Sequence, residues 1–348
     1  MKICLAGNYS RPERAGSSIL KVQQQLLKNL NEQNIHVIFF ESTERKNIFY
    51  KLFDRLIFIQ LGRGTLVRGG VVNLLFYLKE NNYKIIHFVD DRYYMGIICI
   101  FNFIVRTKII VTFHDILNFR DYKKKLFPHF LRIVFTKFCS LILVFSKDDM
   151  ILLRKRYPNK QVNIVRSGVD TKFFSYLESK TTENIILYCG GLSIPYKGLS
   201  FLEDSLSKID ENYKLIICGK NENHYKHKAY IGELSPSEIR EMYQKARIVV
   251  VPSQYDAFSL TVLEAMACGI PTILTQQCGV SNYLKNGIGC FIVNFGNDKE
   301  LTQKISTLLK DDKLWQKMSK DAVETSRDFE WQNISHDYIK QYCQLLAR

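Results

Sequence analysis

Short apolar runs alternate with helical patterns along the whole chain, and this alternation limits the fold more than any other feature. In the first half the runs lie at Lys2–Ala6, His36–Phe40, Lys84–Val89, Lys108–Phe113, Leu141–Ser146 and Val162–Val165. They are nearly continuously apolar, which is typical of parallel strands buried on both faces. After the polar stretch Tyr176–Glu183 the pattern restarts, with runs at Ile185–Cys189, Lys214–Cys218, Ile248–Val251, Thr272–Thr275 and Cys290–Val293. The sequence therefore predicts two α/β domains on parallel sheets, with a boundary near residues 170–183.

The composition is that of a folded protein with enough apolar residues for two cores. Of 348 residues, 46% are hydrophobic and 24% are charged, which excludes intrinsic disorder, collagen and a disulfide miniprotein. The apolar runs are broken by Arg or Lys before they reach the ~18 residues that a membrane-spanning helix needs. Met1–Gly7 leads straight into a strand pattern, so we expect no signal peptide. The nine cysteines form no CxxC pair, which favours buried, reduced thiols in a cytosolic protein.

The net positive charge belongs to the first half of the chain. Residues 1–170 contain 28 Lys and Arg against 13 Asp and Glu, whereas residues 171–348 contain 21 of each, so the first half carries the whole excess of +15. This imbalance indicates an anionic partner, either a membrane surface or a nucleic acid. Lys123–Lys125 precede the Phe-rich helical pattern Leu126–Phe138, and a similar mixture occurs at Lys51–Leu66. Such a mixture is typical of a helix on anionic lipid, and equally of a core-facing helix with a solvated end.

The segment Val249–Thr275 holds the most informative pattern. A strand is followed by a loop at Asp256–Leu260 and by a helix that ends at Gly269, the usual residue for a helix stop. The loop brings backbone N–H groups and a helix N-terminus to the carboxyl edge of the sheet, which suits a phosphate. Glu264 stands in the early turns of this helix. It is either a solvated helix residue or an acceptor for two vicinal sugar hydroxyls, such as those of a ribose.

This segment resembles the carboxyl-terminal signature of the retaining glycosyltransferases of family 4, which have the GT-B fold. The matching positions are Asp256, Phe258-Ser259, Glu264, Ala265-Met266-Ala267 and Gly269-Ile270-Pro271. Asp256 replaces the usual Glu, and Ser259 stands where Gly is common. The resemblance implies that Asp256 holds the donor sugar and that Glu264 binds the ribose. It also implies that the helix amide ends near Phe258, Ser259 and Leu260 bind the diphosphate.

A second match follows the first strand of the second half. The segments Gly190-Gly191-Leu192 and Pro195-Tyr196-Lys197-Gly198 resemble the phosphate-binding loop of the family. The resemblance assigns Gly190 and Lys197 to the diphosphate, where a Lys neutralises the charge that develops on the leaving group. The family usually has Arg after the first Gly, and Gly191 lacks that cation. Either Lys197 and helix dipoles suffice, or a basic residue such as Arg166 or Lys147 substitutes, or the activity is weak.

Two segments of the first half match the family in the same order. Val111–Asp115 resembles the family's strand that ends in His-Asp at the cleft, which implies that His114 donates a hydrogen bond to the donor sugar. Gly168–Asp170 resembles the segment that opens the interdomain linker. There we expect Asp170 to be a turn or cap residue rather than a catalyst.

The remaining matches are shorter. Gly16 is the retained residue of a glycine-rich loop that closes over the diphosphate, although Ser17 or Ser18 as an N-cap explains that loop equally well. Gly219-Lys220 resembles a nucleotide-side loop, and Ile231–Leu234 resembles a segment that flanks the base. The resemblance therefore covers nearly the whole chain.

The resemblance implies two Rossmann-like domains that face each other across a cleft. It assigns residues 1–170 to an acceptor-side domain and 171–330 to a nucleotide-sugar domain, with 331–348 as a helix that crosses back. The implied activity is retaining, metal-independent transfer of a sugar from a nucleotide-sugar donor to a saccharide or lipid-linked saccharide acceptor. The implied setting is surface polysaccharide synthesis at the cytoplasmic face of a membrane. His114, Asp256 and Lys197 are the catalytic candidates, and we expect no metal and no nucleic acid.

Other functions stay open on the sequence. The chain has no Asp-x-Asp pair, no Cys/His cluster with zinc spacing, no GxGxxG after a first strand and no GxxxxGK[ST]. These absences disfavour metal-diphosphate, zinc, nicotinamide and P-loop chemistry. A sugar-nucleotide epimerase or phosphorylase on the same fold is the second enzyme hypothesis. The charge also allows nucleic-acid binding, although no recognition motif is present, and Gly191 allows a non-catalytic partner of another transferase.

Overall fold

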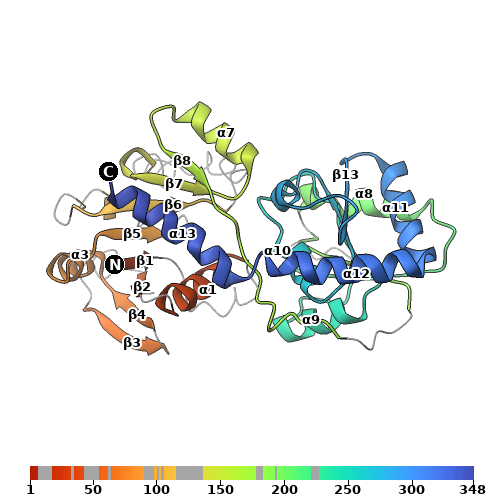
Figure 1. Cartoon of the computed structure of the whole chain (residues 1–348), viewed down its shortest axis with the longest axis horizontal. Helices are drawn as coiled ribbons and strands as arrows, with labels where there is room; N and C mark the ends of the chain where they lie inside the picture. Colours follow the sequence, from red (N-terminus) through yellow and green to blue (C-terminus); the bar gives the residue numbers. More distant parts are fainter. Residues whose placement is uncertain are drawn as a thin grey trace. The chain divides into compact units, whose positions relative to one another are not determined.

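The computed structural model divides the chain into two units (Figure 1). Unit 1 consists of Met1–Val165 and Ile334–Arg348, and unit 2 of Arg166–Asn333. The sequence places the boundary after residue 170, whereas the structure places it after Val165. The structure describes residues 1–6, 18–32, 35–42, 55–61, 64–89, 98–99, 102, 106–114, 136–177, 183–192, 194–220 and 227–348.

The described part of unit 1 is built on a sheet with the strand order β3-β4-β2-β1-β5-β6-β7-β8. Neighbouring strands run parallel, except that β3 and β4 pair antiparallel at one edge. Each of the six apolar runs expected in the first half contains a strand, because strands covered on both faces carry apolar side chains continuously. The strands are β1 (Lys2–Ala6), β2 (His36–Ser42), β3 (Ile57–Leu61), β4 (Gly64–Gly69), β5 (Ile85–Phe88), β6 (Lys108–Thr112), β7 (Leu141–Val144) and β8 (Val162–Ile164).

The hairpin of β3 and β4 corrects the interpretation of Lys51–Leu66 as a helix at a lipid surface. Ile57 lies opposite Arg68, and Phe58 lies opposite Val67, in an antiparallel ladder. β-Branched and aromatic residues such as Ile57 and Phe58 favour this extended backbone. The other such segment, Lys123–Phe138, lies outside the described residues except for its last turn.

Helices α1 (Ser18–Glu32), α3 (Val71–Glu80), α7 (Lys147–Arg156) and α13 (Trp331–Leu346) complete the described part of unit 1. The apolar residues of α3 recur at helical spacing and are buried, namely Val71, Leu74, Leu75 and Leu78. α13 ends the chain yet belongs to unit 1 from Ile334 on. Its Tyr342 hydroxyl is hydrogen-bonded to Nδ1 of the buried His87 at 2.8 Å, and Nε2 of His87 is 2.7 Å from the Thr112 hydroxyl. A polar contact thus fixes the last helix to β5 and β6.

Unit 2 is built on a fully parallel sheet with the strand order β10-β9-β11-β12-β13. Its strands match the five predicted runs residue for residue: β9 (Ile185–Cys189), β10 (Lys214–Cys218), β11 (Ile248–Val251), β12 (Thr272–Thr275) and β13 (Cys290–Val293). The helices are α8 (Leu199–Leu206), α9 (Pro236–Lys245), α10 (Leu260–Ala267), α11 (Asp298–Lys310) and α12 (Asp312–Arg327), with 3₁₀ turns η3 (Pro195–Lys197) and η4 (Gly279–Tyr283). Leu202 of α8 and Leu301 and Ile305 of α11 pack on one face of this sheet. The loops after β9, β10 and β11 therefore meet at one edge.

Two features bear on the setting in which the chain works. No described helix combines the length and the apolar character that crossing a bilayer requires. All nine cysteines lie among the described residues, and none of them is in a disulfide. Burial raises the pKa of the Cys139 and Cys278 thiols to about 12, so both stay protonated near neutral pH.

Candidate functional site

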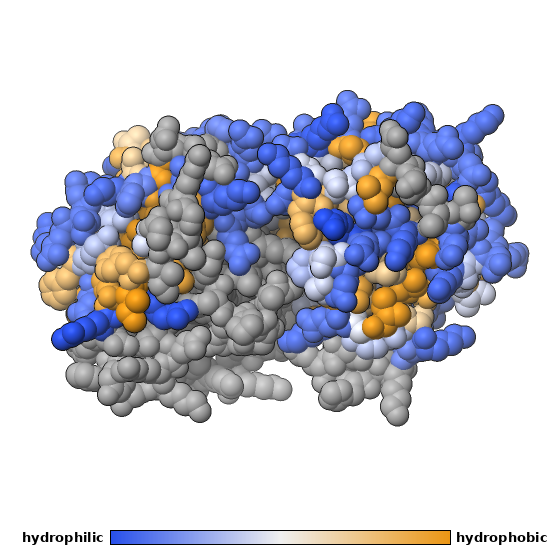
Figure 2. Space-filling model, turned by 90° about the horizontal axis from the view of Figure 1, so that it is seen from below, coloured by the Kyte–Doolittle hydropathy of each residue, from blue (hydrophilic) through white to orange (hydrophobic). Residues whose placement is uncertain are grey.

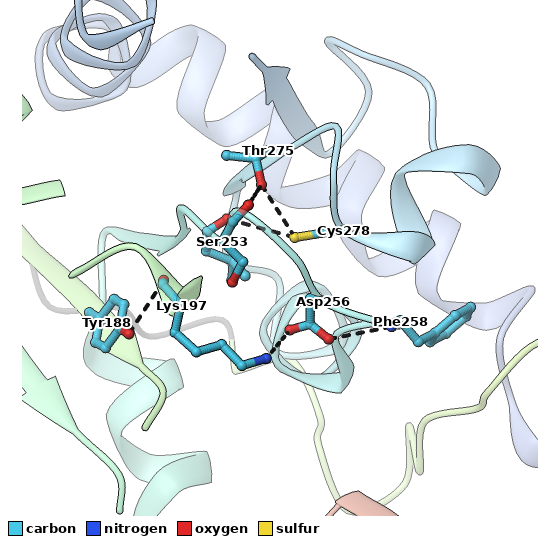
Figure 3. Close-up of polar contacts among 8 residues, drawn as sticks. Tyr188, Lys197, Ser253, Asp256, Phe258, Thr275 and Cys278 are labelled. Carbon is cyan, nitrogen blue, oxygen red and sulfur yellow. Dashed lines mark hydrogen bonds and ion pairs between the residues drawn. The ribbon is translucent and has the colours of Figure 1, made fainter. Parts of the chain in front are cut away.

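Lys197 and Asp256 form an ion pair at the carboxyl edge of the unit 2 sheet. Nζ of Lys197 lies 2.8 Å from Oδ2 of Asp256, and the two side chains point toward each other (Figure 3). Lys197 ends η3 after β9, and Asp256 lies in the loop after β11, so neighbouring strands deliver the two groups. Their side chains are 25% and 18% exposed. The structure thus joins two residues that the sequence assigned separately, Lys197 to the diphosphate and Asp256 to the sugar.

The ion pair with Asp256 keeps Lys197 protonated. Burial acts to lower the pKa of the Lys197 ammonium, but the charge and hydrogen bond of Asp256 outweigh it, so that the pKa is raised. Lys197 is therefore a permanent cation at physiological pH. A buried cation that keeps a partner in the absence of ligand avoids the cost of an unpaired buried charge.

Backbone hydrogen bonds hold the loop of Asp256 in place. Oδ1 of Asp256 accepts a hydrogen bond from the amide of Phe258 at 3.3 Å. The carbonyl of Asp256 accepts from the amide of Gly279 at 2.8 Å, and the carbonyl of Phe258 accepts from Val280 at 3.0 Å. The loop is thereby fixed to η4, and α10 starts directly after it. The N–H groups of the first turn of a helix have no intrahelical partners, and their use as an anion site at α10 stays a prediction.

Ser259 keeps the backbone conformation that a glycine would adopt. As the N-cap of α10 it has φ 73° and ψ 85°, in the left-handed region. The family commonly has Gly at this position, and the structure retains that geometry with a serine. Its side chain is 6% exposed and makes no capping hydrogen bond, and its hydroxyl has no partner among the described residues.

Glu264 is buried inside unit 2. It is 5% exposed, and its Oε2 accepts a hydrogen bond from the Tyr243 hydroxyl of α9 at 3.2 Å. Burial raises the pKa of Tyr243 well above its usual value, and the charges of the nearby Cys189 and Glu264 raise it further. The phenol therefore keeps its proton and stays a donor. The solvated reading of Glu264 is therefore wrong, and its ribose role stays a prediction. No sequence motif pointed to Tyr243, a helix residue without a local signature.

Two glycines of the site are needed for close backbone approach. A Cβ on Gly198, which has φ 76°, would lie 1.9 Å from the carbonyl oxygen of Pro252. A Cβ on Gly219, which has φ 128°, would lie 2.3 Å from the carbonyl oxygen of Gly190. Gly190 itself donates to the carbonyl of Cys218 at 3.1 Å. The loops after β9 and β10 thus touch through their backbones, which requires glycine at Gly198 and Gly219.

His114 lies in unit 1, directly after β6. Its Nε2 donates to the carbonyl oxygen of Val89 at 2.7 Å, and its ring centre lies 5.0 Å from that of Phe145, with the two rings tilted by 51°. A carbonyl only accepts, so this bond puts the proton on Nε2. The ring is held at the carboxyl end of β6, as the sequence match predicts, and its contact with a donor sugar stays a prediction.

The other candidates divide into one structural residue and one outside the described chain. Asp170 caps a turn, because its Oδ1 accepts from the amide of Phe173 at 3.1 Å, which confirms the structural interpretation. Gly16 lies outside the described residues. In the part of the chain that is described, no group of three or more His, Cys, Asp and Glu side chains is arranged to hold a metal ion.

Two family models together match most of the chain. Residues 169–325 match the model for glycosyl transferases group 1. Residues 21–173 match the model for Glycosyltransferase Family 4. The two matched ranges meet close to the boundary between unit 1 and unit 2.

Individual proteins agree with these matches. An uncharacterized glycosyltransferase of Methanocaldococcus jannaschii is 26% identical over 58% of this chain and 61% of its own length. The "GalNAc-alpha-(1->4)-GalNAc-alpha-(1->3)-diNAcBac-PP-undecaprenol alpha-1,4-N-acetyl-D-galactosaminyltransferase" of Campylobacter jejuni is 23% identical over 68% of each chain. Sucrose-phosphate synthase from Thermosynechococcus elongatus has a similar fold, with a TM-score of 0.76 at 19% identity over 99% of both chains. The match thus spans about three fifths of the archaeal relative.

Proposed function

Because this chain belongs to the group 1 glycosyl transferases of the GT-B fold, we propose that it transfers a sugar from a nucleotide-sugar donor to a saccharide or lipid-linked saccharide acceptor. The observation that carries the proposal is the Lys197–Asp256 pair at the loop that leads into α10. A permanent cation and the N-terminus of a helix at one sheet edge suit the diphosphate of such a donor. The Campylobacter relative, whose name states an undecaprenol-linked acceptor, supports the acceptor class.

In this proposal Lys197 and Asp256 have different roles. Lys197 stabilises the negative charge that develops on the departing diphosphate, and the amides of Phe258, Ser259 and Leu260 bind its oxygens. When the diphosphate pairs with the ammonium of Lys197, the carboxylate of Asp256 is released and accepts hydrogen bonds from the donor sugar hydroxyls. Glu264, oriented by Tyr243, accepts hydrogen bonds from the ribose hydroxyls. These steps need positioning and fixed charges rather than a nucleophile.

We also propose that the transfer retains the anomeric configuration and needs no metal. His114 would donate from Nδ1 to the donor sugar, and this requires the doubly protonated ring because Nε2 already donates to the Val89 carbonyl. Its ring also lies against that of Phe145. The diphosphate would leave from the face on which the acceptor approaches. Lys197 and the α10 amides would supply the positive charge that a divalent ion supplies in other transferases.

The test is the release of nucleoside diphosphate from a panel of UDP-, GDP- and ADP-sugars, with and without acceptor saccharides. We expect Lys197→Ala to lower kcat by about 10²–10³-fold, as for the loss of one fixed charge at a leaving group. Lys208→Ala is the matched control, because Lys208 also pairs with an aspartate, Asp298, elsewhere in unit 2. Activity should survive EDTA, and NMR of the product should show the donor's anomeric configuration.

The outcomes separate the hypotheses. Equal activity of Lys197→Ala and Lys208→Ala would show that the site is misplaced. Turnover without an acceptor would indicate an epimerase, and dependence on inorganic phosphate a phosphorylase. Donor binding without turnover would indicate a non-catalytic partner of another transferase. Loss of activity in EDTA that is restored by Mg²⁺ would overturn metal independence.

We further propose that unit 1 contacts an anionic membrane surface from the cytoplasmic side. Ile57 and Phe58 of β3 and Phe76 of α3 are 57%, 49% and 48% exposed, and Phe58 packs 5.1 Å from the ring of Tyr77, next to Phe76. Arg68 stands opposite Ile57. Figure 2 shows hydrophobic residues gathered on this part of unit 1, at the left of the view, among hydrophilic ones. Exposed apolar side chains beside a cation suit an anionic lipid surface.

Vesicle flotation tests this contact. The double variant Ile57→Ser/Phe58→Ser should lose binding to vesicles that contain phosphatidylglycerol. The control is Ile151→Ser/Leu152→Ser, which removes a pair on α7 with 62% and 50% exposure. Equal loss in both variants, or equal binding of the wild type to neutral vesicles, would contradict the proposal.

A further inference from the structure

Backbone hydrogen bonding between the segments of β9 and β10 continues beyond the two strands. Within the strands, Cys218 pairs with Cys189, and the amide of Gly190 accordingly donates to the carbonyl of Cys218. Two residues later the same pattern recurs, because the amide of Leu192 donates to the carbonyl of Lys220 at 3.0 Å. In a parallel ladder this bond pairs Lys220 with the residue before Leu192. Lys220 is therefore the neighbour of Gly191 across the ladder.

This pairing puts a cation beside the position that lacks one. Neighbouring segments of a sheet lie ~4.8 Å apart, so the backbone of Lys220 lies close to that of Gly191. Gly191 has no side chain of its own, and the side chain that a Cβ there would meet first is the flexible Ile194. Lys220 is exposed and lies at the carboxyl edge to which the phosphate-binding loop also belongs.

The charge balance of the site calls for a second cation. Lys197 is already paired with Asp256, so this pair contributes no net charge. A diphosphate carries more than one negative charge, and the α10 amides supply only partial positive charge. One further fixed cation near the loop after β9 would complete the neutralisation.

Arg166 and Lys147 are the other basic residues considered for this role. The guanidinium of Arg166 lies 5.9 Å from the centre of the Phe329 ring, which in turn lies 6.4 Å from that of Phe258. Lys147 opens α7. Lys220 is the one of the three whose backbone is seen to bond the loop after β9, through the amide of Leu192.

We propose that Lys220 binds the diphosphate of the donor and takes the place of the cation missing at Gly191. The inference rests on the proposed function, since it names a further residue for the same leaving group. Lys220 acts by charge on the phosphate oxygens and not on the base. In this proposal the second cation of the site comes from the segment after β10 and not from the loop after β9.

Isothermal titration of the full chain with UDP, GDP and ADP, and with the parent nucleosides, tests the proposal. For the diphosphate that binds best, we expect Lys220→Ala to weaken affinity about 5- to 10-fold, the loss of one charge-assisted contact near solvent. Lys220→Arg should keep the affinity. Lys214→Ala is the control, because Lys214 is exposed at the opposite end of β10. Affinity for the nucleoside should not change in any variant.

Charge relocation provides the second test. A Cβ at Gly191 would meet only the Ile194 side chain, with Cδ1 nearest at 2.8 Å, and this flexible group can turn away. Lys220→Ala/Gly191→Arg should therefore regain most of the lost diphosphate affinity.

Three results would overturn the inference. The first is a diphosphate affinity of Lys220→Ala equal to that of the wild type. The second is an equal loss of affinity for the nucleoside in Lys220→Ala. The third is no recovery of diphosphate affinity in Lys220→Ala/Gly191→Arg when this double variant has the Tm of the wild type. If Lys197→Ala weakens binding and Lys220→Ala does not, only this inference fails. If the wild type binds none of the three diphosphates, the proposed function fails as well.

Discussion

Replacing Ser259 by Gly should stabilise unit 2, because Ser259 carries two unfavourable features at the start of α10. Its φ of 73° brings the Cβ of an L-residue close to the following carbonyl oxygen. Its hydroxyl is buried without a hydrogen-bond partner among the described residues. Glycine removes both features and leaves the path of the loop unchanged.

The magnitude follows from three contributions. A left-handed L-residue costs ~1–2 kcal/mol, and a buried hydroxyl without a partner costs ~1–3 kcal/mol. The greater chain entropy of an unfolded glycine opposes these gains by ~0.5–1 kcal/mol. The net gain is about 2 kcal/mol, which raises Tm by ~4–8 °C in a domain of roughly 150–250 residues. Ser259→Ala keeps the Cβ and gains only the hydroxyl contribution.

Thermal and urea unfolding of the full chain measure the effect. The expected order of stability is Ser259→Gly, then Ser259→Ala, then the wild type, with Ser259→Val last because a β-branched residue fits the left-handed region worst. A Ser259→Gly variant less stable than the wild type would refute the reasoning. Equal gains for Gly and Ala would mean that relief of the backbone conformation is no larger than the entropy cost of glycine.

Three further predictions concern stability. Burial, and then the charge of His114, lowers the pKa of His87 from 6.5 to about 3. Below pH 6.5 the unfolded chain therefore binds a proton that the folded chain excludes. The free energy of unfolding should then fall by up to ~1.4 kcal/mol per pH unit as the pH is lowered. His87→Gln should flatten this acid dependence in urea unfolding. On α13, Tyr338→Phe should stabilise the protein by ~1 kcal/mol, because the buried Tyr338 hydroxyl has no partner among the described residues. Tyr342→Phe should destabilise it by a similar amount, because it removes the hydrogen bond to His87. Thermal unfolding of the two variants side by side distinguishes these effects. Gly198→Ala should lower expression and Tm strongly, since its Cβ would overlap the Pro252 carbonyl.

The strands of unit 2 could be predicted to the residue because their ends are marked chemically. Each run is continuously apolar, and β9 and β10 are each followed at once by Gly190 or Gly219. Parallel strands covered on both faces leave no ambiguity of period. The hairpin β3–β4 could not be predicted in this way, because an edge strand is half exposed and its Ile57 and Phe58 read as part of an amphipathic helix.

The contacts of the candidate site were predictable only in part. The edge rule for parallel sheets brings the loops of Lys197 and Asp256 together, although they are 59 residues apart, but it does not say that the two side chains pair. The left-handed conformation of Ser259 agrees with the glycine that the family prefers there. The partner of Glu264 could not be found, because Tyr243 lies on another helix and tertiary packing alone brings them together. The sequence match placed Lys220 in a nucleotide-side loop, but only the backbone bond between Lys220 and Leu192 places it beside Gly191.

The last helix has a consequence for how the chain is made. Unit 1 needs Ile334–Arg348, which a ribosome delivers only after the whole of Arg166–Asn333. At roughly 5–20 residues per second that interval lasts ~10–30 s. Throughout it, nascent unit 1 has His87 without Tyr342 and an uncovered apolar face, so the earlier-made half of the protein is the later one to mature and the one that depends more on chaperones.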